Sequence, residues 1–519
     1  MANKSIANDS GASFSLWMHT RVPGYRQELP DSCEADVCVI GAGIAGLTTA
    51  YLLGLEGRRV VVIDDGPIAG GETSRTTAHL ASAQDDRFTF LLRYHGAAGI
   101  KLIAESHAAA IDRIEAICSR ESIDCDFRRV DGYLFNPPGG SSKFLEEERK
   151  AAQRAGLADV ELVARAPLPS FDTGPALRFP NQGQFDPLRY VRGLAAAIDK
   201  QGGHLYTGVR ADKIEAGSPA RVVTASGRRI TAKAVVVATN APINSLVSLP
   251  LKQAAYRSYV VGFAVPKGAI QLGLYWDTED PYHYVRLVEE SAASDVLIVG
   301  GEDHKTGQDE QTDPQLRFER LEKWTRERFP MAGELTQKWS GQVMEPVDGV
   351  GFIGRSPGHD ANVYLITGDS GQGMTHATLG AVLVTDLIGG RPNPWETLYD
   401  PSRNVMRAAG EFLRENANVA AQYLDWLGKG DVASVDEIKP GTGAILRKGA
   451  RLLAVYRDEV GVCHARSAAC THLGGVVSWN GLEKTWDCPC HGTRFSALGR
   501  VLNGPAKHDL VVADLKDEA

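Results

Sequence analysis

Short apolar runs, each followed by glycines and a helical pattern, recur along the first 400 residues. The first is ADVCVI (35–40), which precedes a glycine turn, GAGIAG (41–46). In the next segment, LTTAYLLGLEG (47–57), apolar residues recur at helical spacing, and RRVVVIDD (58–65) is a second run of strand length. The pattern predicts a strand–helix–strand unit between residues 35 and 65.

Two later segments repeat the strand pattern. AVVVATN (234–240) and NVYLITG (362–368) are apolar, and THATLGAVLVTDLIGG (375–390) is typical of a helix. The strands near 40, 60, 236 and 365 therefore look like members of one sheet, interrupted by insertions. We predict an α/β, Rossmann-like nucleotide-binding domain built from segments at about 35–100, 180–250 and 345–400. An inserted α+β substrate domain would comprise about 100–180 and 250–345.

The composition changes near residue 430. From there to residue 519, strand-sized runs alternate with glycine turns, which favours a small all-β domain. We therefore expect two domains, 1–430 and 431–519. A chain of 519 residues is also too long for one ordinary core.

Composition and charge narrow the class of protein. The hydrophobic share of 43% and the charged share of 23% are ordinary for a soluble globular chain. A net charge of -8 argues against nucleic-acid binding through a basic surface. No apolar run reaches the roughly 18–20 residues of a membrane span, and the N-terminal segment lacks a secretion pattern. Eight cysteines are too few for a disulfide scaffold, so we expect a cytoplasmic protein.

The unit at 35–64 carries a dinucleotide fingerprint in full context. Gly41 permits the tight turn, Gly43 lets backbone approach a pyrophosphate, and Gly46 lets the helix pack against the strand. Asp64, at the end of the second strand, can accept hydrogen bonds from ribose hydroxyls. A second match, GVGFIG (349–354), runs straight into RSPG, so no helix can follow and we interpret it as a strand edge.

The long interruption of the nucleotide fold favours FAD over NAD. The segments ADVCVIGAGIAGLTTAYLL, VVVIDDG, KAVVVATNAP and YLITGDSGQGMTHATLGAVLVTDLI resemble the FAD-dependent glycine/D-amino-acid oxidase (DAO) family. The resemblance covers roughly residues 30–400. It implies cofactor contacts from five segments: Gly41, Gly43, Ile44, Ala45, Gly46, Asp64 and Asp65; Gly71, Thr73, Ser74, Arg75, Thr76, Thr77, Ala78 and His79; Val209; Ala238 and Thr239; and Gly368, Gly371, Gln372, Gly373, Met374 and Thr375.

The same resemblance bears on how FAD is held. Some members attach FAD covalently through a histidine in the 70–80 segment. Arg75 stands at that position here, and His79 comes four residues later. We therefore expect non-covalent FAD.

The C-terminal region contains CTH (470–472) and CPCH (488–491), each offering one sulfur and one nitrogen. A structural zinc also accepts two cysteines and two histidines, but zinc fingers usually group like ligands in sequence. Rieske [2Fe-2S] centres place two cysteines on one iron and two histidines on the other. Residues 431–519 resemble the Rieske family, which implies the ligands Cys470, His472, Cys488 and His491.

Two departures from the respiratory Rieske pattern concern the cluster loops. Those proteins carry two further cysteines that form a disulfide, and one would align with Gly475. Cys490 would then have no disulfide partner. Thr493 stands where those proteins often place a serine that hydrogen-bonds to the cluster.

Together the two halves suggest an FAD-dependent oxidoreductase. We expect it to oxidise an amine or amino-acid-like substrate at FAD and to pass electrons singly through the Rieske cluster to an external acceptor, which is a protein, a quinone or oxygen. Candidate substrate contacts are Arg257, Tyr259, Tyr282, His283 and Tyr284, although an ion pair or sheet packing would also explain them. The alternatives are an electron-transfer component that supplies a partner oxygenase, and a redox sensor without turnover.

Overall fold

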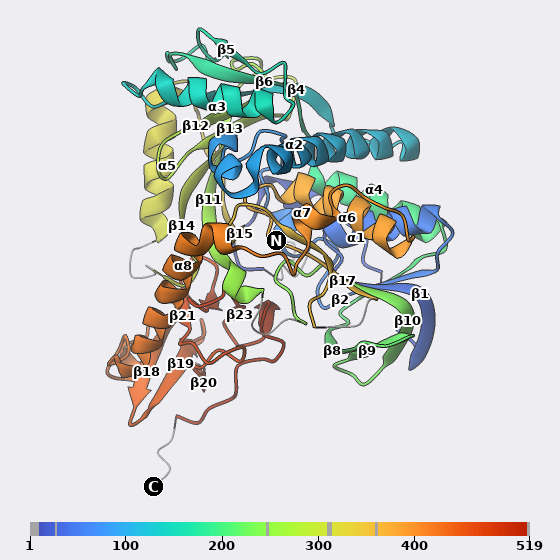
Figure 1. The fold of residues 1–519 in the computed structure, drawn as a ribbon. Coiled ribbons are helices and arrows are strands. Elements are labelled where there is room, and N and C mark those ends of the chain that lie inside the picture. The colour runs from blue at the N-terminus through green and yellow to red at the C-terminus, as the bar shows by residue number, and fades with distance from the viewer. Residues whose placement is uncertain (1–9, 26–27, 245–248, 309–313, 359–361, 516–519) are drawn as a thin grey trace.

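The structure is a computed structural model that describes residues 10–25, 28–244, 249–308, 314–358 and 362–515. Its N-terminal body contains two large sheets with helices packed on them. A smaller C-terminal part, coloured orange to red in Figure 1, lies against this body.

The four predicted strands do belong to one sheet. They are β1 (Ser32–Ile40), β2 (Val60–Asp64), β10 (Arg229–Val237) and β17 (Val363–Thr367), and they run parallel in the order β17-β10-β1-β2. The sheet is extended by β7 (His204–Thr207) beside β2 and by the antiparallel β16 (Phe352–Arg355) beside β17. β16 contains the end of GVGFIG, which confirms its interpretation as a strand.

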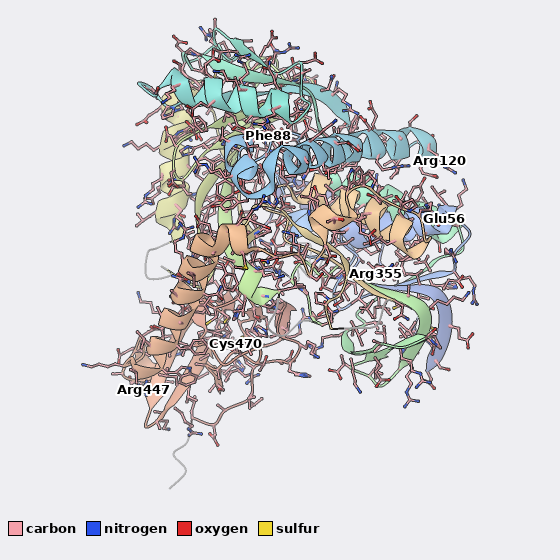
Figure 2. All side chains as sticks on the ribbon, in the orientation of Figure 1. Glu56, Phe88, Arg120, Arg355, Arg447 and Cys470 are labelled. Carbon is pink, nitrogen blue, oxygen red and sulfur yellow. The ribbon has the colours of Figure 1, made fainter. Side chains whose placement is uncertain are left out.

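Helices cover this sheet because the parallel strands are apolar on both faces. α1 (Ile44–Leu55) packs against α6 (Gly373–Ile388) and α4 (Pro187–Lys200). α2 (Phe88–Glu121) lies across α6, and Figure 2 labels Phe88 and Arg120 near its two ends. A hairpin of β8 (Ala211–Glu215) and β9 (Ala220–Thr224) extends from β10.

The insertions form a second, mixed sheet of nine strands, which agrees with the predicted α+β architecture of this part of the chain. Its order is β15-β11-β14-β13-β12-β4-β6-β3, with β5 (Glu161–Val163) beside β6. The strands are β3 (His79–Leu80), β4 (Arg128–Phe135), β6 (Ala176–Gln184), β11 (Gln253–Pro266), β12 (Leu274–Asp277), β13 (Tyr284–Glu289), β14 (Ser294–Lys305) and β15 (Leu335–Pro346). α3 (Ser142–Arg154) and α5 (Pro314–Arg328) accompany it.

The C-terminal part is built of small antiparallel sheets, as predicted. After α7 (Glu396–Tyr399) and α8 (Ala409–Gln422), one sheet contains β18 (Thr442–Lys448), β19 (Arg451–Arg457) and β20 (Cys463–Ser467). The other contains β21 (Ser478–Asn480), β22 (Thr485–Asp487), β23 (Arg494–Ser496) and β24 (Val501–Asn503). In the part of the chain that the structure describes, no helix is both long and apolar enough to cross a bilayer.

Candidate functional site

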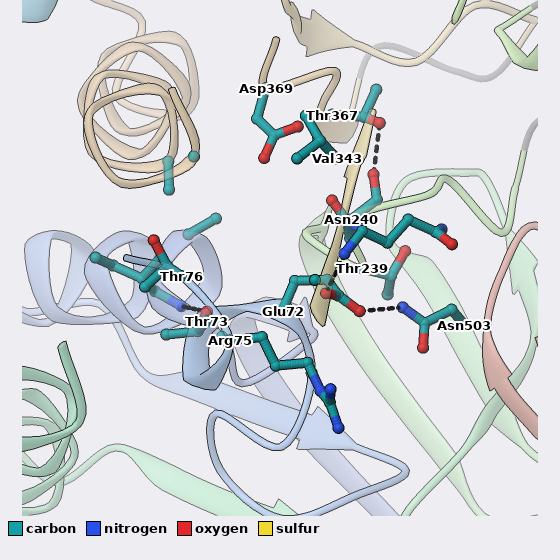
Figure 3. A pocket seen from close by; sticks show the side chains of 18 of the residues that line it. Glu72, Thr73, Arg75, Thr76, Thr239, Asn240, Val343, Thr367, Asp369 and Asn503 are labelled. Carbon is teal, nitrogen blue, oxygen red and sulfur yellow. Dashed lines mark hydrogen bonds between the residues drawn. The ribbon is translucent and has the colours of Figure 1, made fainter. Parts of the chain in front are cut away.

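A large cavity opens where the strands of the parallel sheet end. Its wall includes Gly41 after β1, Asp64 at the end of β2, Ala238 after β10 and Gly368 after β17. Ligands of open α/β sheets bind at the carboxyl ends of the strands. Figure 3 shows part of this wall, with Thr73 and Thr76 on one side and Thr239 and Asn240 on the other.

The glycine turn at the cavity leaves no room for side chains. Gly41 has a φ of +109°, and a Cβ there would lie 2.3 Å from the carbonyl oxygen of Ala238. A Cβ on Gly46 would lie 1.9 Å from the carbonyl oxygen of Gly41. The turn therefore brings bare backbone and the N-terminus of α1 to the cavity, which fits the diphosphate of a dinucleotide.

Asp64, at the end of the neighbouring strand β2, stabilises this turn by hydrogen bonds. Its carboxylate accepts hydrogen bonds from the backbone nitrogens of Ala42 (2.6 Å) and Gly66 (2.8 Å). The sequence predicted a contact from Asp64 to ribose and did not predict these backbone bonds. Val209, expected to offer backbone to the adenine, already donates its N–H to the Asp64 carbonyl (2.7 Å).

Most residues implied as cofactor contacts do line the cavity. They are Gly41, Gly43, Ile44, Ala45, Asp64, Asp65, Gly71, Thr73, Arg75, Thr76, Thr77, His79, Val209, Ala238, Thr239, Gly368, Gly371, Gln372, Gly373 and Met374. Four others, Gly46, Ser74, Ala78 and Thr375, are not part of its wall. Gly46 and Thr375 are buried in helices, and Ser74 donates a hydrogen bond to the Gly71 carbonyl.

The candidate substrate residues separate into two groups. Tyr282 and Tyr284 line the cavity next to each other, with ring centroids 5.7 Å apart. Tyr282 donates a hydrogen bond to Asp85 (3.2 Å), and the Tyr284 hydroxyl lies 2.7 Å from Ser258 Oγ. Both rings therefore present an aromatic wall with polar tips.

Arg257, Tyr259 and His283 are not part of that wall, which corrects the expectation for them. Arg257 is fully buried and lies 3.6 Å from Glu483 of the C-terminal domain. Tyr259 packs in the sheet core against Phe318. His283 is bonded to Asp277 (2.8 Å) and stacks on Trp324 at 4.3 Å. Arg257 and Tyr259 alternate along β11 with Ser258 and Val260, which do line the cavity, because successive strand residues face opposite sides.

Sequence reasoning missed a set of carboxylates in the same cavity. Asp85, Asp303, Glu345 and Asp369 all line it, although they come from four separate segments. Burial raises the pKa of Asp369 to about 6. Burial also raises the pKa of Asp303 to about 7, with Asp85 and Glu302 adding to the effect and Ser258 and Arg317 opposing it. No spacing pattern joins these acids in the sequence, so only the fold could bring them together.

The four cysteines and histidines predicted as cluster ligands lie on two adjacent loops of the C-terminal domain. Cys470, Cys488 and His491 are buried, and the rings of His472 and His491 lie 4.9 Å apart. Both loops are fixed by backbone bonds, from Cys470 N to the Gly475 carbonyl and from Cys488 N to the Thr493 carbonyl, each 2.8 Å. These bonds hold two thiols and two imidazoles together.

The chemistry of this donor set fits a [2Fe-2S] cluster. Burial, and then His472, lower the pKa of His491 to about 4, so its imidazole is neutral, as a metal ligand requires. Within the described residues, the buried Nε2 of His491 has no hydrogen-bond partner. Thr493 accepts a hydrogen bond from Ala506 N (3.1 Å), which ties the 504–506 loop to the ligand loops.

Gly475 lies directly beside Cys490. A Cβ on Gly475 would be 2.5 Å from Cys490 Sγ, so the glycine occupies the place where a disulfide partner would stand. Cys490 is therefore a free thiol that lies against the backbone of Gly475, where a second sulfur would be needed for a disulfide.

A buried glutamate joins the C-terminal domain to the N-terminal body. Glu483 is fully buried and forms an ion pair with Arg75 (3.1 Å), and Ser13 Oγ donates to it at 2.6 Å. Ser340 also donates to its carboxylate. Burial alone would raise the pKa of Glu483, but Arg75, Arg257 and Arg494 outweigh this effect and hold it at about 2.

A second contact links the ligand loop to the cavity. Gln342 lines the cavity, and its Nε2 donates to the carbonyl oxygen of Gly492 (3.0 Å), the residue after His491. Glu72, also in the wall, accepts hydrogen bonds from Gln342 N (2.7 Å) and from Asn503 Nδ2 (3.0 Å); Figure 3 shows the bond to Asn503. Residues 501–504 of the C-terminal domain complete this side of the cavity.

Comparison with known proteins agrees with both halves of the site. The family model "FAD dependent oxidoreductase" (DAO) matches residues 36–387, and "Rieske [2Fe-2S] domain" matches 428–514. The chain is 31% identical to "Putative Rieske 2Fe-2S iron-sulfur protein YhfW" of Bacillus subtilis, over 99% of this chain and 100% of that protein. It is 28% identical to gamma-glutamylputrescine oxidoreductase of Escherichia coli, over 70% of this chain and 85% of that protein.

The fold of most of the chain is shared with solved structures. Glycine oxidase from Geobacillus kaustophilus superposes with a TM-score of 0.60 at 18% identity, covering 72% of this chain and 99% of the oxidase. At this identity the likeness concerns the fold alone.

Proposed function

Since the chain belongs to the FAD dependent oxidoreductase (DAO) family and continues into a Rieske [2Fe-2S] domain, we propose that it oxidises an amine at FAD and delivers the electrons through the cluster to an external acceptor. The single observation that carries this proposal is Gln342, which lines the FAD cavity and bonds the residue next to His491. The amine is favoured also because gamma-glutamylputrescine oxidoreductase is a relative over most of its own length.

The reaction balances as follows. A substrate R–CH2–NH2 loses a hydride from carbon and a proton from nitrogen, giving the imine R–CH=NH, which water converts to an aldehyde and ammonia. FAD supplies the two-electron acceptor and the cluster a one-electron outlet. Two equivalents of an external one-electron acceptor then take the two electrons.

The chain's own residues have three tasks in this scheme. The glycine turn and the N-terminus of α1 hold the diphosphate, and Cys470, His472, Cys488 and His491 hold the cluster. Tyr282 and Tyr284 shape the substrate end of the cavity and exclude water from it. Glu483 and Gln342 keep the ligand loops in one position against the cavity, which makes the two redox sites neighbours on one chain at high effective concentration.

Anaerobic stopped-flow spectroscopy tests the proposal. A substrate amine should bleach the flavin absorbance, and the cluster spectrum should then change within the same turnover. Gln342→Leu should slow the second phase and leave the first unchanged, whereas Gln337→Leu, on the same strand, should alter neither. A cluster that stays oxidised while the flavin is bleached contradicts the relay, and bleaching by NAD(P)H in place of amines supports the electron-transfer component instead.

A further inference from the structure

One side of the cavity is a wall of carboxylates. Asp85 accepts hydrogen bonds from Tyr282 (3.2 Å) and from Gln372 Nε2 (3.0 Å). Ser370 Oγ lies within hydrogen-bond distance of Glu345 (3.1 Å) and of Asp86 (2.5 Å) behind the wall, and its single proton can serve one of these carboxylates at a time. Four acids, Asp85, Asp303, Glu345 and Asp369, thus line one cavity from four segments of the chain.

The protein around the wall balances these charges only in part: Arg87 lowers the pKa of Asp85 and Arg317 lowers that of Asp303, but burial raises both. Asp303 Oδ1 is buried and has no hydrogen-bond partner within the described residues, although its side chain lines the cavity. Burial raises the pKa of Glu345 well above its ordinary value, and the neighbouring acids Asp86, Asp369, Asp85 and Asp303 raise it further. A buried anion without a partner is costly, so the wall is suited to a cationic ligand.

Aromatic rings complete the same space. Tyr282, Tyr284 and Trp276 line the cavity together with the acids. The Tyr284 hydroxyl lies 2.7 Å from Ser258 Oγ, and Ser258 also lines the cavity. Ammonium groups bind to aromatic faces through the ring quadrupole, and more strongly where water is excluded.

The arginines of the cavity wall, Arg75 and Arg210, form ion pairs with carboxylates outside the cavity. Arg75 is bonded to Glu483, Ser340 and Ser13. Arg210 forms an ion pair with Asp509 (2.7 Å) of the C-terminal domain. Arg257, a candidate substrate contact in the sequence, is buried outside the wall. The lining residues therefore favour a second positive charge on the substrate over a carboxylate.

From this geometry we infer that the substrate is a di- or polyamine, whose second ammonium group is held by Asp85, Asp303 and Glu345 between the aromatic rings. The inference rests on the proposed amine oxidation and names its substrate class. The amine that reacts is the one near the flavin, and the distant ammonium fixes the chain in the cavity. α-Amino acids, which carry a carboxylate beside the reacting amine, would be poor substrates.

A matched set of four-carbon amines tests this under anaerobic conditions. Butane-1,4-diamine, butylamine and 4-aminobutanoate differ only in the distant group, which is positive, neutral or negative. The diamine should bleach the flavin with a kcat/KM at least tenfold above butylamine and a hundredfold above 4-aminobutanoate. Asp303→Asn should lower the ratio of kcat/KM for the diamine to kcat/KM for butylamine at least tenfold. Glu290→Gln, an exposed acid on the β13–β14 turn, should leave this ratio unchanged.

A binding measurement separates the charge effect from turnover. 2,5-Dimethylhexane-2,5-diamine has no hydrogen on the carbons that bear nitrogen, so it binds without being oxidised. Calorimetry on the FAD-loaded protein should show binding that weakens at least tenfold in Asp303→Asn. Equal rates for the diamine and 4-aminobutanoate, or no binding of the blocked diamine, overturn the inference while the proposed function stands. If no amine bleaches the flavin, the proposed function fails as well.

Discussion

Replacing Glu483 by glutamine tests whether a buried charge fixes the C-terminal domain on the FAD-binding body. The substitution keeps the shape of the side chain but removes the charge that faces Arg75 and Arg257. The carboxylate of Glu483 accepts hydrogen bonds from Ser13 and Ser340. The amide of glutamine has one accepting oxygen and one donating nitrogen, so it cannot accept on both sides as the carboxylate does.

The size of the effect follows from the pKa of Glu483. Its fall from the ordinary value of 4.5 to about 2 corresponds to about 3 kcal/mol, at about 1.36 kcal/mol per pKa unit. Because the pKa is lowered, this stabilisation is complete above pH 4.5 and is lost as the pH falls toward 2. Removing one partner of a buried ion pair costs about 3–5 kcal/mol, so we expect the docking equilibrium at pH 7 to weaken about a hundredfold.

Amide hydrogen exchange measured by mass spectrometry reports this equilibrium peptide by peptide. Peptides that cover residues 338–345 and 483–494 should exchange about a hundredfold faster in Glu483→Gln, since exchange follows the open population. The hairpin at 442–457, in the interior of the C-terminal domain, serves as an internal reference and should be unchanged. Glu459→Gln, an exposed glutamate in the same domain, is the matched variant.

Two results would refute the reasoning. If the peptides at 338–345 exchange at the wild-type rate in Glu483→Gln, the buried charge does not hold the domains together. If the reference hairpin accelerates as much as the interface, the substitution has unfolded the domain and the loss is not one of docking.

Three further predictions concern the cluster loops and the acidic wall. Gly475→Cys should form a disulfide with Cys490, because its Cβ would lie 2.5 Å from that sulfur. Thiol titration of the denatured protein should show one free thiol fewer than the eight of wild type, and one thiol more would contradict the geometry. Cys488→Ser should abolish the visible cluster spectrum and Cys490→Ser should retain it; the reverse outcome would reassign the ligand. The raised pKa of Asp303, about 7, means that its contribution to the free energy of unfolding of the unliganded protein falls as the pH rises from about 4 to about 7. The melting temperature of Asp303→Asn should therefore rise relative to that of wild type between pH 5 and pH 8. A difference that stays constant with pH would show that the pKa of this carboxyl is not raised.

The parts of the fold that the sequence predicts well depend on local patterns. The glycine turn after β1, the parallel strands near 60, 236 and 365, and the small all-β domain each have a signature within a dozen or so residues. The sulfur and nitrogen ligands are equally local, because C-x-H and C-x-x-H place each pair on a single loop.

The parts that could not be predicted depend on contacts between distant segments. The acidic wall joins Asp85, Asp303, Glu345 and Asp369, each an ordinary charged residue in its own surroundings. The sequence makes Arg257 a candidate substrate contact or a member of an ion pair, and the fold places it beside Glu483 of the C-terminal domain. The alternation of side chains along a strand predicts which residues share a face of the sheet. It does not predict which distant residues pack against that face.

The bonds of Ser13 to Glu483, 470 positions apart, also set an order of assembly during synthesis. A ribosome releases the segment around Ser13 and Arg75 long before residue 483 has been made. Ser13 and Arg75 therefore lack their partner, the Glu483 carboxylate, until the last part of the chain has left the ribosome. Nascent chains stalled before and after residue 483 would thus differ in how well protected residues 70–80 are from a protease, although that segment is identical in both.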